Sequence, residues 1–427
     1  MKDQNKNNMM QFNKLRRFLL LSVLSMLSGS LLAQTALDGY LQKAAENNPG
    51  LQSKFSEYYA ALEKVPQVGS LPNPQVLLGY YILPVETRVG ARNFDATLSQ
   101  SFPWFGTLSA KKDEASHWAA VRYQAFMVEK NDLFYQVKEV YYQLWFIDRS
   151  IGTYQEYLEI LDLQEQSTLK EVEAAKSSLA DVLRIQMERK EITAQLEWLQ
   201  DNRKTVEANM NSLLNQPMET PISMNDSLAI QTLNPYENNL LDSVMANNPK
   251  IKALNEQNLA WEKQKEVARK NGMPSFGVGI SYASVSRRTD MDVPQNGQDM
   301  LMPMATISIP LYRNKYKAMV KEADYHMQGV QQELTDTKNT LAADFIMAIN
   351  QYRDAERKTK LYQELLKQAQ ETLEILTTAY MTAKEDYEEI LRMQQQLLKY
   401  QLELEHAKSN QNAAVALLEK LMAKGIE

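Results

Sequence analysis

The sequence predicts a mostly helical α+β chain that contains two copies of one unit, each a helix, two strands and a long helical hairpin. Three observations lead to this prediction. Residues 110–216 contain no proline, and their apolar residues lie alternately three and four positions apart. Landmarks of the first half recur in the same order roughly 200 residues later. Segments in which apolar and polar residues alternate precede each long helical span.

The first long span has the pattern of a coiled coil that folds back on itself. Apolar residues keep the spacing without a break at Val137, Val140, Leu144, Ile147, Ile151, Tyr154, Leu158 and Leu161. A single helix over the whole span would be about 160 Å long, at about 1.5 Å per residue. Ser178 and Asp181 have the spacing of a capping box. We therefore expect a hairpin over about 110–214 with its tip at about 176–179; two separate surface helices are the alternative.

Four landmarks indicate the internal repeat. Asn47-Asn48-Pro49 recurs as Asn247-Asn248-Pro249, and Pro103-Trp104-Phe105 recurs as Pro310-Leu311-Tyr312. The segment that starts at Asp181 recurs at Glu389, and the cap Ser178-x-x-Asp181 recurs as Asp386-x-x-Glu389. We therefore expect one repeat over 34–214, an equatorial linker over 215–235, and a second repeat over 236–427 with a hairpin at about 315–424 and its tip at about 384–387.

The amino terminus and the composition bound the class of protein. Residues 1–33 have the basic start, the short apolar run and the small residues of a secretory signal peptide. The run is short for a membrane-spanning helix, so we expect cleavage before Gln34 rather than an uncleaved anchor. The chain has no cysteine, which excludes disulfides and thiolate metal sites. Its net charge is -6 at pH 7, and without a basic face nucleic acid is not an expected partner.

Each repeat contains two segments with the alternation of β-strands. We expect the strands at about 74–83, 94–103, 274–285 and 300–309. In the first strand Val76, Leu78, Tyr80 and Ile82 share one face, and in the last strand Leu301, Ala305, Ile307 and Ile309 oppose Met300, Met302, Met304, Thr306 and Ser308. A first helix over 36–65 would bend at Pro49 and end before Pro66. The polar segments Glu86–Asn93 and Arg287–Asp299 would be loops between paired strands.

Strands with one apolar and one polar face are typical of an outer-membrane barrel, although a soluble sheet on a core gives the same alternation. The signal peptide and the aromatic residues near the strand ends favour the barrel; these are Tyr80, Tyr81, Phe102, Trp104, Phe105, Tyr282 and Tyr312. Four strands cannot close a barrel, and open sheet edges are not tolerated in lipid. We therefore expect a homotrimer that supplies twelve strands, with the polar loops on the outside.

At both predicted tips the sequence resembles the TolC-like outer-membrane efflux protein family. The family's tip pattern resembles Tyr-x-x-Gly-x-x-Ser/Thr-x-x-Asp-Val-Leu. The chain reads Val172-x-x-Ala175-x-x-Ser178-x-x-Asp181-Val182-Leu183 at the first tip and Tyr380-x-x-Ala383-x-x-Asp386-x-x-Glu389-Ile390-Leu391 at the second. Together with the duplicated layout, the resemblance covers essentially all of the mature chain. Both tip glycines of the family are alanines here, which favours turns that are closed by the caps.

The resemblance implies a passive export channel. Its twelve-stranded transmembrane β-barrel would lie in the bacterial outer membrane and continue as a long α-helical barrel across the periplasm, with the equatorial linker as a belt round its middle. The expected function is that of the outer-membrane component of a tripartite efflux system. The tips would meet a periplasmic adaptor, or membrane fusion protein, that is bound to an inner-membrane transporter, expected to be of the RND type.

The resemblance also assigns candidate residues at the tips. The channel aperture is expected at Asp181, Arg184, Glu389 and Arg392. The turns that would contact the adaptor are Lys176, Ser177 and Ser178 in the first hairpin and Lys384, Glu385 and Asp386 in the second. In well-known members the second tip carries two carboxylates one turn apart, whereas only Glu389 of the matching pair is acidic here. Glu389 and Arg392 could lock the tip by ion pairs; ordinary solvated helix charges are the alternative.

No cofactor and no enzymatic activity are expected. The three histidines have no ligand-like spacing, and the sequence contains neither a phosphate-binding loop nor a nucleophile elbow. Met300, Met302 and Met304 fall on the polar face of one predicted strand. Thioethers suit copper(I) or silver, although methionine also fills gaps in cores. A soft-metal path along these residues is therefore a hypothesis.

Two other functions remain open on the sequence alone. The same architecture would serve a type I protein-secretion channel, and the sequence does not choose among metal ions, drugs, amphiphiles and proteins as the exported substrate. A soluble periplasmic coiled-coil adaptor or scaffold would also contain a helical hairpin. Adaptors usually carry one hairpin, whereas this sequence predicts two, together with strands whose apolar faces suit lipid.

Overall fold

The computed structural model describes residues 36–175, 177–224, 228–232, 239–381 and 387–424. The predicted signal peptide therefore lies outside the described residues. The chain divides into two compact units, which are described separately. The first unit comprises Met1–Asn48, Leu133–Gln231 and Tyr352–Ala416, and the second comprises Pro49–Asp132, Thr232–Gln351 and Leu417–Glu427. The coarse part of the predicted fold class is confirmed, since the described residues are mostly helical with one four-stranded antiparallel sheet; the trimeric barrel and the repeats remain predictions.

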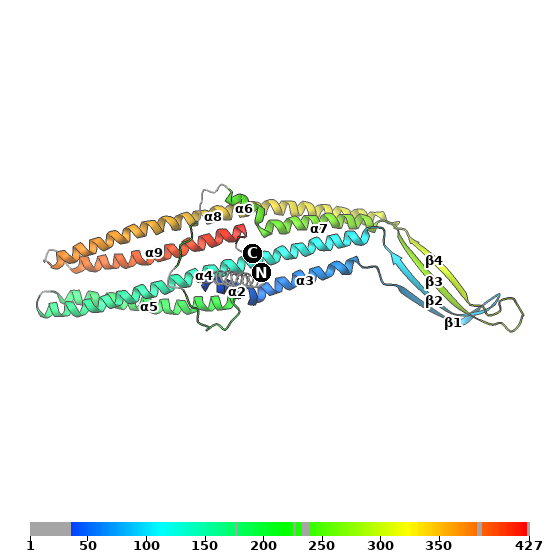
Figure 1. The fold of residues 1–427 in the computed structure, drawn as a ribbon, viewed down its shortest axis with the longest axis horizontal. Coiled ribbons are helices and arrows are strands. Elements are labelled where there is room, and N and C mark those ends of the chain that lie inside the picture. The colour runs from blue at the N-terminus through cyan, green and yellow to red at the C-terminus, as the bar shows by residue number, and fades with distance from the viewer. Residues whose placement is uncertain (1–35, 176, 225–227, 233–238, 382–386, 425–427) are drawn as a thin grey trace, which may run out of the picture. The chain divides into compact units, whose positions relative to one another are not determined.

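The first unit contains two antiparallel helical hairpins (Figure 1). The second part of α4 (Thr107–Glu173) turns into α5 (Leu179–Leu213), and the second part of α8 (Arg313–Met381) is followed by α9 (Tyr387–Met422). The short helix α2 (Ala36–Asn47) belongs to the same unit. The predicted seam residues form much of its core, since Val137, Leu144 and Ile147 of α4 are at most 1% exposed.

Aromatic and aliphatic side chains join the two hairpins near their tips. This core cluster contains Tyr157 and Leu161 from α4, Ile185 and Ile192 from α5, and Tyr387, Leu391 and Leu398 from α9. Burial of a side chain of this size stabilises by about 1.5–3 kcal/mol. The cluster therefore makes the two hairpins one packed bundle rather than two independent arms.

The second unit contains the sheet and the helices next to it. These helices are α3 (Pro49–Gly69), the first part of α4, α6 (Leu240–Asn247), α7 (Pro249–Asn271) and the first part of α8. The strands β1 (Gln75–Thr87), β2 (Gly90–Phe102), β3 (Ser275–Ser286) and β4 (Met300–Ser308) lie side by side in the order of the chain (Figure 1). None of the described helices has a segment long and apolar enough to span a membrane.

The strand register places the predicted residues on the predicted faces. Val76 pairs with Leu98, Leu98 with Ile280, and Tyr282 with Leu301, so the predicted apolar residues of the four strands share one face, although Leu77, which pairs with Thr97, lies on the other. The opposite face carries small and polar residues, for example Ser281 opposite Met302. No described element covers the apolar face, because Val76, Leu78, Val278 and Ile307 are 57–65% exposed.

Two predictions about the ends of these elements are wrong. The helix expected to end before Pro66 continues to Gly69. An interior proline removes one helical hydrogen bond and crowds the preceding turn, at a cost of about 3 kcal/mol. Against this cost, α3 packs on α4 through ring contacts of Phe55 with Phe126 and of Tyr58 with Tyr123.

The loop expected over Glu86–Asn93 is instead a tight turn between long strands. Thr87 pairs directly with Gly90, and the Thr87 hydroxyl donates a hydrogen bond to the Gly90 carbonyl at 2.7 Å. Gly90 has a φ of +130°, which favours glycine. Polar composition suggested a loop, but polar residues also occur within strands near the end of a sheet.

Replacement of Gly90 by alanine should disrupt this turn. A Cβ at Gly90 would lie 1.7 Å from the Ser286 carbonyl oxygen, in a backbone conformation that costs other residues about 1–3 kcal/mol. We expect trypsin to cleave Gly90→Ala after Arg88 or Arg92 faster than it cleaves the wild type. Gly79→Ala is the matched control, since the nearest atom to its added Cβ is 3.7 Å away. Equal cleavage of both variants would contradict the role of Gly90.

Candidate functional site

The first tip turn is held by a left-handed residue and a capping box. Ala175 has a φ of +53°, and its N–H donates to the Val172 carbonyl at 3.0 Å, which is the geometry of a helix C-terminus that usually carries glycine. The Ser178 N–H donates to Asp181 Oδ2 at 3.1 Å, and the Asp181 N–H donates to Ser178 Oγ at 3.3 Å. The predicted capping box is therefore present.

Asp181 also collects the hydroxyls of the turn. Ser178 Oγ and Ser177 Oγ donate to Asp181 Oδ2 at 2.8 and 3.1 Å. Burial of the Asp181 carboxyl raises its pKa, but the hydrogen bonds from Ser178 and Ser177 and the charge of Arg184 outweigh burial, so the pKa lies below its ordinary value. The carboxylate form of Asp181 is thus the form that the folded tip stabilises.

A chain of five charges connects the two hairpins at this level. Arg184 contacts Asp181 Oδ1 and Glu388 Oε2, each at 3.1 Å, and so joins α5 to α9. Arg392 contacts Glu388 Oε1 at 3.2 Å and Glu389 Oε1 at 3.0 Å. Glu389 pairs with Arg392 within one chain, and the expected lock by a ring of three Glu389 beside three Arg392 remains a prediction. Sequence reasoning missed Glu388, which only becomes central once the two hairpins lie side by side.

These charges are accessible to water. The side chains of Arg184, Glu388 and Arg392 are 46%, 48% and 63% exposed. Exposed ion pairs contribute only about 0–1 kcal/mol each and weaken in salt. The link between the tips is therefore easily broken compared with the apolar cluster beneath it.

Tyrosine hydroxyls form a second link between the hairpins. Tyr380 of α8 donates to Glu171 Oε2 of α4 at 2.8 Å, and Tyr387 of α9 donates to Gln164 Oε1 of α4 at 2.9 Å. Burial and the hydrogen bond to Glu171 raise the pKa of Tyr380 to about 12. The hydroxyl therefore stays protonated and remains a donor at neutral pH. Neither contact follows from the periodicity of a single helix.

Not every candidate tip residue can be placed. Lys176, Lys384, Glu385 and Asp386 lie outside the described residues, as does Ala383. Of the expected aperture residues, Asp181, Arg184, Glu389 and Arg392 all belong to the five-charge chain. Ser177 and Ser178 serve the cap of α5. Their contact with an adaptor remains a prediction.

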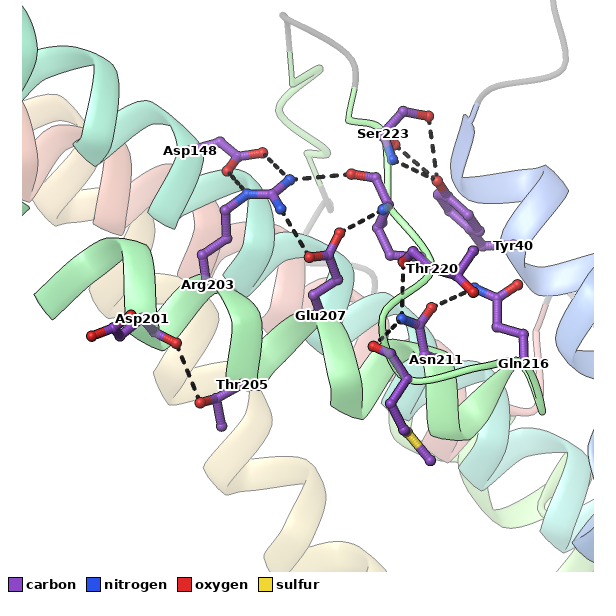
Figure 2. Close-up of polar contacts among 12 residues, drawn as sticks. Tyr40, Asp148, Asp201, Arg203, Thr205, Glu207, Asn211, Gln216, Thr220 and Ser223 are labelled. Atoms are coloured by element: carbon purple, nitrogen blue, oxygen red, sulfur yellow. Dashed lines mark hydrogen bonds and ion pairs between the residues drawn. The ribbon is translucent and has the colours of Figure 1, made fainter. Parts of the chain in front are cut away.

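The linker after α5 is fastened to the first hairpin by Arg203 and Glu207 (Figure 2). Arg203 Nε donates to Asp148 Oδ1 at 2.6 Å, and Arg203 also contacts Glu207 at 3.2 Å and the Ile222 carbonyl at 3.1 Å. Glu207 Oε1 in turn accepts the Ile222 N–H at 2.6 Å. Through this network Arg203 ties α4, α5 and the linker together.

Further contacts hold the linker on both hairpins. The buried Asn211 amide donates to the carbonyls of Met218 and Thr220 at 2.7 and 2.9 Å, and Tyr40 of α2 donates to the Ser223 carbonyl at 3.0 Å (Figure 2). On the second hairpin, Asn412 of α9 donates to the Ala229 carbonyl at 3.0 Å and accepts the Gln231 N–H at 2.9 Å. We call the described linker residues 215–224 and 228–232 the strap.

Glycine at position 175 should stabilise the first tip, because it removes the penalty of a left-handed alanine. The expected gain is about 1 kcal/mol, which would slow hydrogen exchange of the turn amides about fivefold. Exchange measured by mass spectrometry on the 170–182 segment checks this. The neighbouring Ala174→Gly is the control and should not slow exchange, since only Ala175 among the described residues of the turn has a positive φ. Slower exchange in both variants would refute the explanation.

The tip should loosen in acid through Asp181. Because its pKa is lowered in the folded tip, the carboxylate stabilises the tip above the unfolded pKa of about 3.9, and this contribution is lost as the pH falls through the lower folded pKa. The chain has no cysteine, so one spin label at exposed Leu179 can report mobility. We expect mobility to rise on acidification in the wild type but much less in Asp181→Asn. An equal rise in both proteins would assign the effect to other groups.

Comparisons with known proteins agree with this geometry. Residues 240–424 match the outer membrane efflux protein family. No curated protein matches the chain. Among solved structures, CusC, studied for the conformational changes that accompany folding and transmembrane channel formation, has 16% identity and a TM-score of 0.76, covering 93% of this chain and 96% of CusC.

Two further structures have the same fold. The outer membrane protein VceC of Vibrio cholerae has 15% identity and a TM-score of 0.73, over 92% of this chain and 97% of VceC. The MtrE outer membrane channel of Neisseria gonorrhoeae, in its open state, has 15% identity and a TM-score of 0.71, over 92% of this chain and 89% of MtrE. The predicted resemblance is therefore confirmed: residues 240–424 match the model of the outer membrane efflux protein family, and the chain has the fold of these channels.

Proposed function

We propose that the chain is the outer-membrane channel of a tripartite efflux system, assembled as a homotrimer. The observation that carries the proposal is the sheet with one uncovered apolar face and two free edges. Side chains such as Leu78 and Ile307 are 64% and 61% exposed and would face lipid. The edge strands β1 and β4 have no partner in the described chain. Pairing of β4 with β1 of a second copy would satisfy both edges and, with three copies, close a barrel.

The channel would be a passive duct whose energy comes from elsewhere. Its tips would meet a periplasmic adaptor, and the adaptor an inner-membrane transporter of the RND type. The five-charge chain and the tyrosine contacts would hold the hairpins together at rest, and their separation would widen the duct. Exposed ion pairs suit this role, since a partner can replace them at small energetic cost.

Two alternatives make different demands. A type I protein-secretion channel would have the same barrel and tips but a different inner-membrane partner. A soluble adaptor would leave the apolar face of the sheet in water, which monomeric proteins avoid over large areas. Extraction separates the last case: a channel needs detergent and runs as a heat-labile trimer, whereas an adaptor is released by osmotic shock.

Conductance in a planar bilayer tests the proposal directly. We expect the purified wild type to insert and to show a small conductance. Arg184→Ala combined with Tyr380→Phe removes a cross-hairpin ion pair and a cross-hairpin hydrogen bond. The removed contacts contribute about 1–2 kcal/mol together, so the conductance or the open probability should rise severalfold.

A surface pair on the same helix provides the control. Lys204 and Asp201 of α5 form an ion pair at 3.0 Å with side chains 75% and 78% exposed, and no second hairpin is involved. Lys204→Ala should therefore conduct like the wild type. Protein that stays soluble without detergent and never conducts would rule out the channel. If the conductance of the Lys204 variant rose equally, the tip contacts would not explain the effect, although the channel proposal itself would still stand.

A further inference from the structure

The methionines of β4 line the polar face of the sheet, where apolar side chains are not needed for contact with lipid. The register places Met300, Met302 and Met304 opposite Ala283, Ser281 and Gly279 of β3. Met300 and Met302 are 39% and 54% exposed, and Met304 is half-buried. The three thioethers are therefore accessible and do not fill a core.

Small residues on β3 leave room beside this row. The methyl group of Met304 lies 3.5 Å from the position that a Cβ on Gly279 would take. The Ser281 hydroxyl, opposite Met302, is hydrogen-bonded at 2.9 Å to Thr97 Oγ1 of β2, the neighbouring strand away from β4. The thioethers can thus turn over β3 without competition from a large neighbour. Successive methionines lie about 6.6 Å apart along the strand, which flexible side chains with three rotatable bonds can bridge.

Two carboxylates near the row, Asp95 and Asp299, already accept hydrogen bonds from other groups. Asp95 of β2 lies opposite Ala283 of β3. Its carboxylate accepts hydrogen bonds from Arg92 Nε at 2.6 Å and from the Tyr81 hydroxyl at 2.8 Å. Asp299, which precedes the row, accepts the Tyr282 hydroxyl and the Val285 N–H. The cross-strand partners of the methionines include no carboxylate and no imidazole. The row therefore offers soft sulfur ligands without the oxygen ligands that magnesium or calcium prefers.

We propose that Met300, Met302 and Met304 form a path for soft monovalent cations, copper(I) or silver(I), on the lumen wall. The proposal rests on the proposed channel function and adds a substrate class to it. Thioether ligands are neutral, so they bind a soft cation without placing a charged side chain on the wall. Successive equivalent sites allow the ion to pass from one methionine to the next. In a trimer, three such rows would line one duct.

Silver block of the potassium current tests the path. In a chloride-free nitrate electrolyte, silver ions should lower the current of the wild-type channel at low concentration, while magnesium at the same concentration should not. Met300→Leu, Met302→Leu and Met304→Leu together keep the apolar volume but remove the sulfurs. In this variant we expect the half-blocking silver concentration to rise by at least about tenfold.

A matched control separates the row from methionine in general. Met187, Met218 and Met347 lie outside the sheet and are 69%, 56% and 48% exposed. Their combined replacement by leucine should leave the silver block unchanged. Should the triple variant of β4 fail to insert, Met302→Leu alone should still weaken the block. An unchanged block in Met302→Leu would then count against the row.

The outcomes keep the two proposals apart. A protein that inserts and conducts potassium, but whose silver block is absent or equal in all variants, overturns the metal path and leaves the channel. Equal block by silver and magnesium also overturns the path, because it shows no preference for soft ions. A protein that never conducts overturns the channel itself. Calorimetric titration of the wild-type protein in detergent with silver nitrate still tests the path in that case, since sites lost in the β4 variant would be direct evidence for it.

Discussion

The unpaired edges of the sheet constrain everything else in this molecule. Four strands with one uncovered apolar face leave the outer edges of β1 and β4 without a neighbouring strand among the residues that the structure describes. Each unsatisfied backbone group would cost several kcal/mol in lipid. In the proposed channel a single copy would therefore be incomplete, and closure with further copies would account for both the free edges and the exposed apolar face. The glycine turn at Gly90 and the tight β1–β2 pairing matter because they keep the strands long enough for this role.

The two polar networks of the helical unit differ in strength for a physical reason. At the strap, the Arg203, Asp148 and Glu207 side chains are 27%, 30% and 15% exposed, and carbonyl and amide groups of the linker complete the network. At the tips, the exposed fractions of Arg184, Glu388 and Arg392 are 46–63%. Charge pairs weaken as water reaches them. The polar network at the strap is thus the stronger of the two.

The sequence predicted what repeats along one helix or strand. The seam residues, the capping box at Ser178 and Asp181, and the faces of all four strands follow from local spacing, and the structure contains them. The cross-hairpin partners could not be predicted in this way. Glu388 and Glu171 acquire their roles only because α9 and α8 lie beside α5 and α4. The role of Arg203 was equally hidden, because its linker partner Ile222 has no periodic signature in the sequence. The end of α3 was mispredicted because the sequence shows the cost of Pro66 but not the stabilisation that the helix gains by packing on α4.

The positions of the strap contacts, the apolar cluster and the tip contacts determine where the two hairpins can separate. The strap holds α4 and α5 through Asp148, Arg203 and Asn211, and it holds α9 through Asn412. The apolar cluster begins beside the tip charges, at Tyr387 and Leu391, and extends toward the strap contacts as far as Leu398. Breaking the tip contacts costs about 1–2 kcal/mol, whereas exposing even two side chains of the cluster costs about 3–6 kcal/mol. Separation of the hairpins would therefore start at the tips and stop at the cluster, so that a partner that competes for Arg184 and Glu388 could move the ends of the bundle without unfolding it.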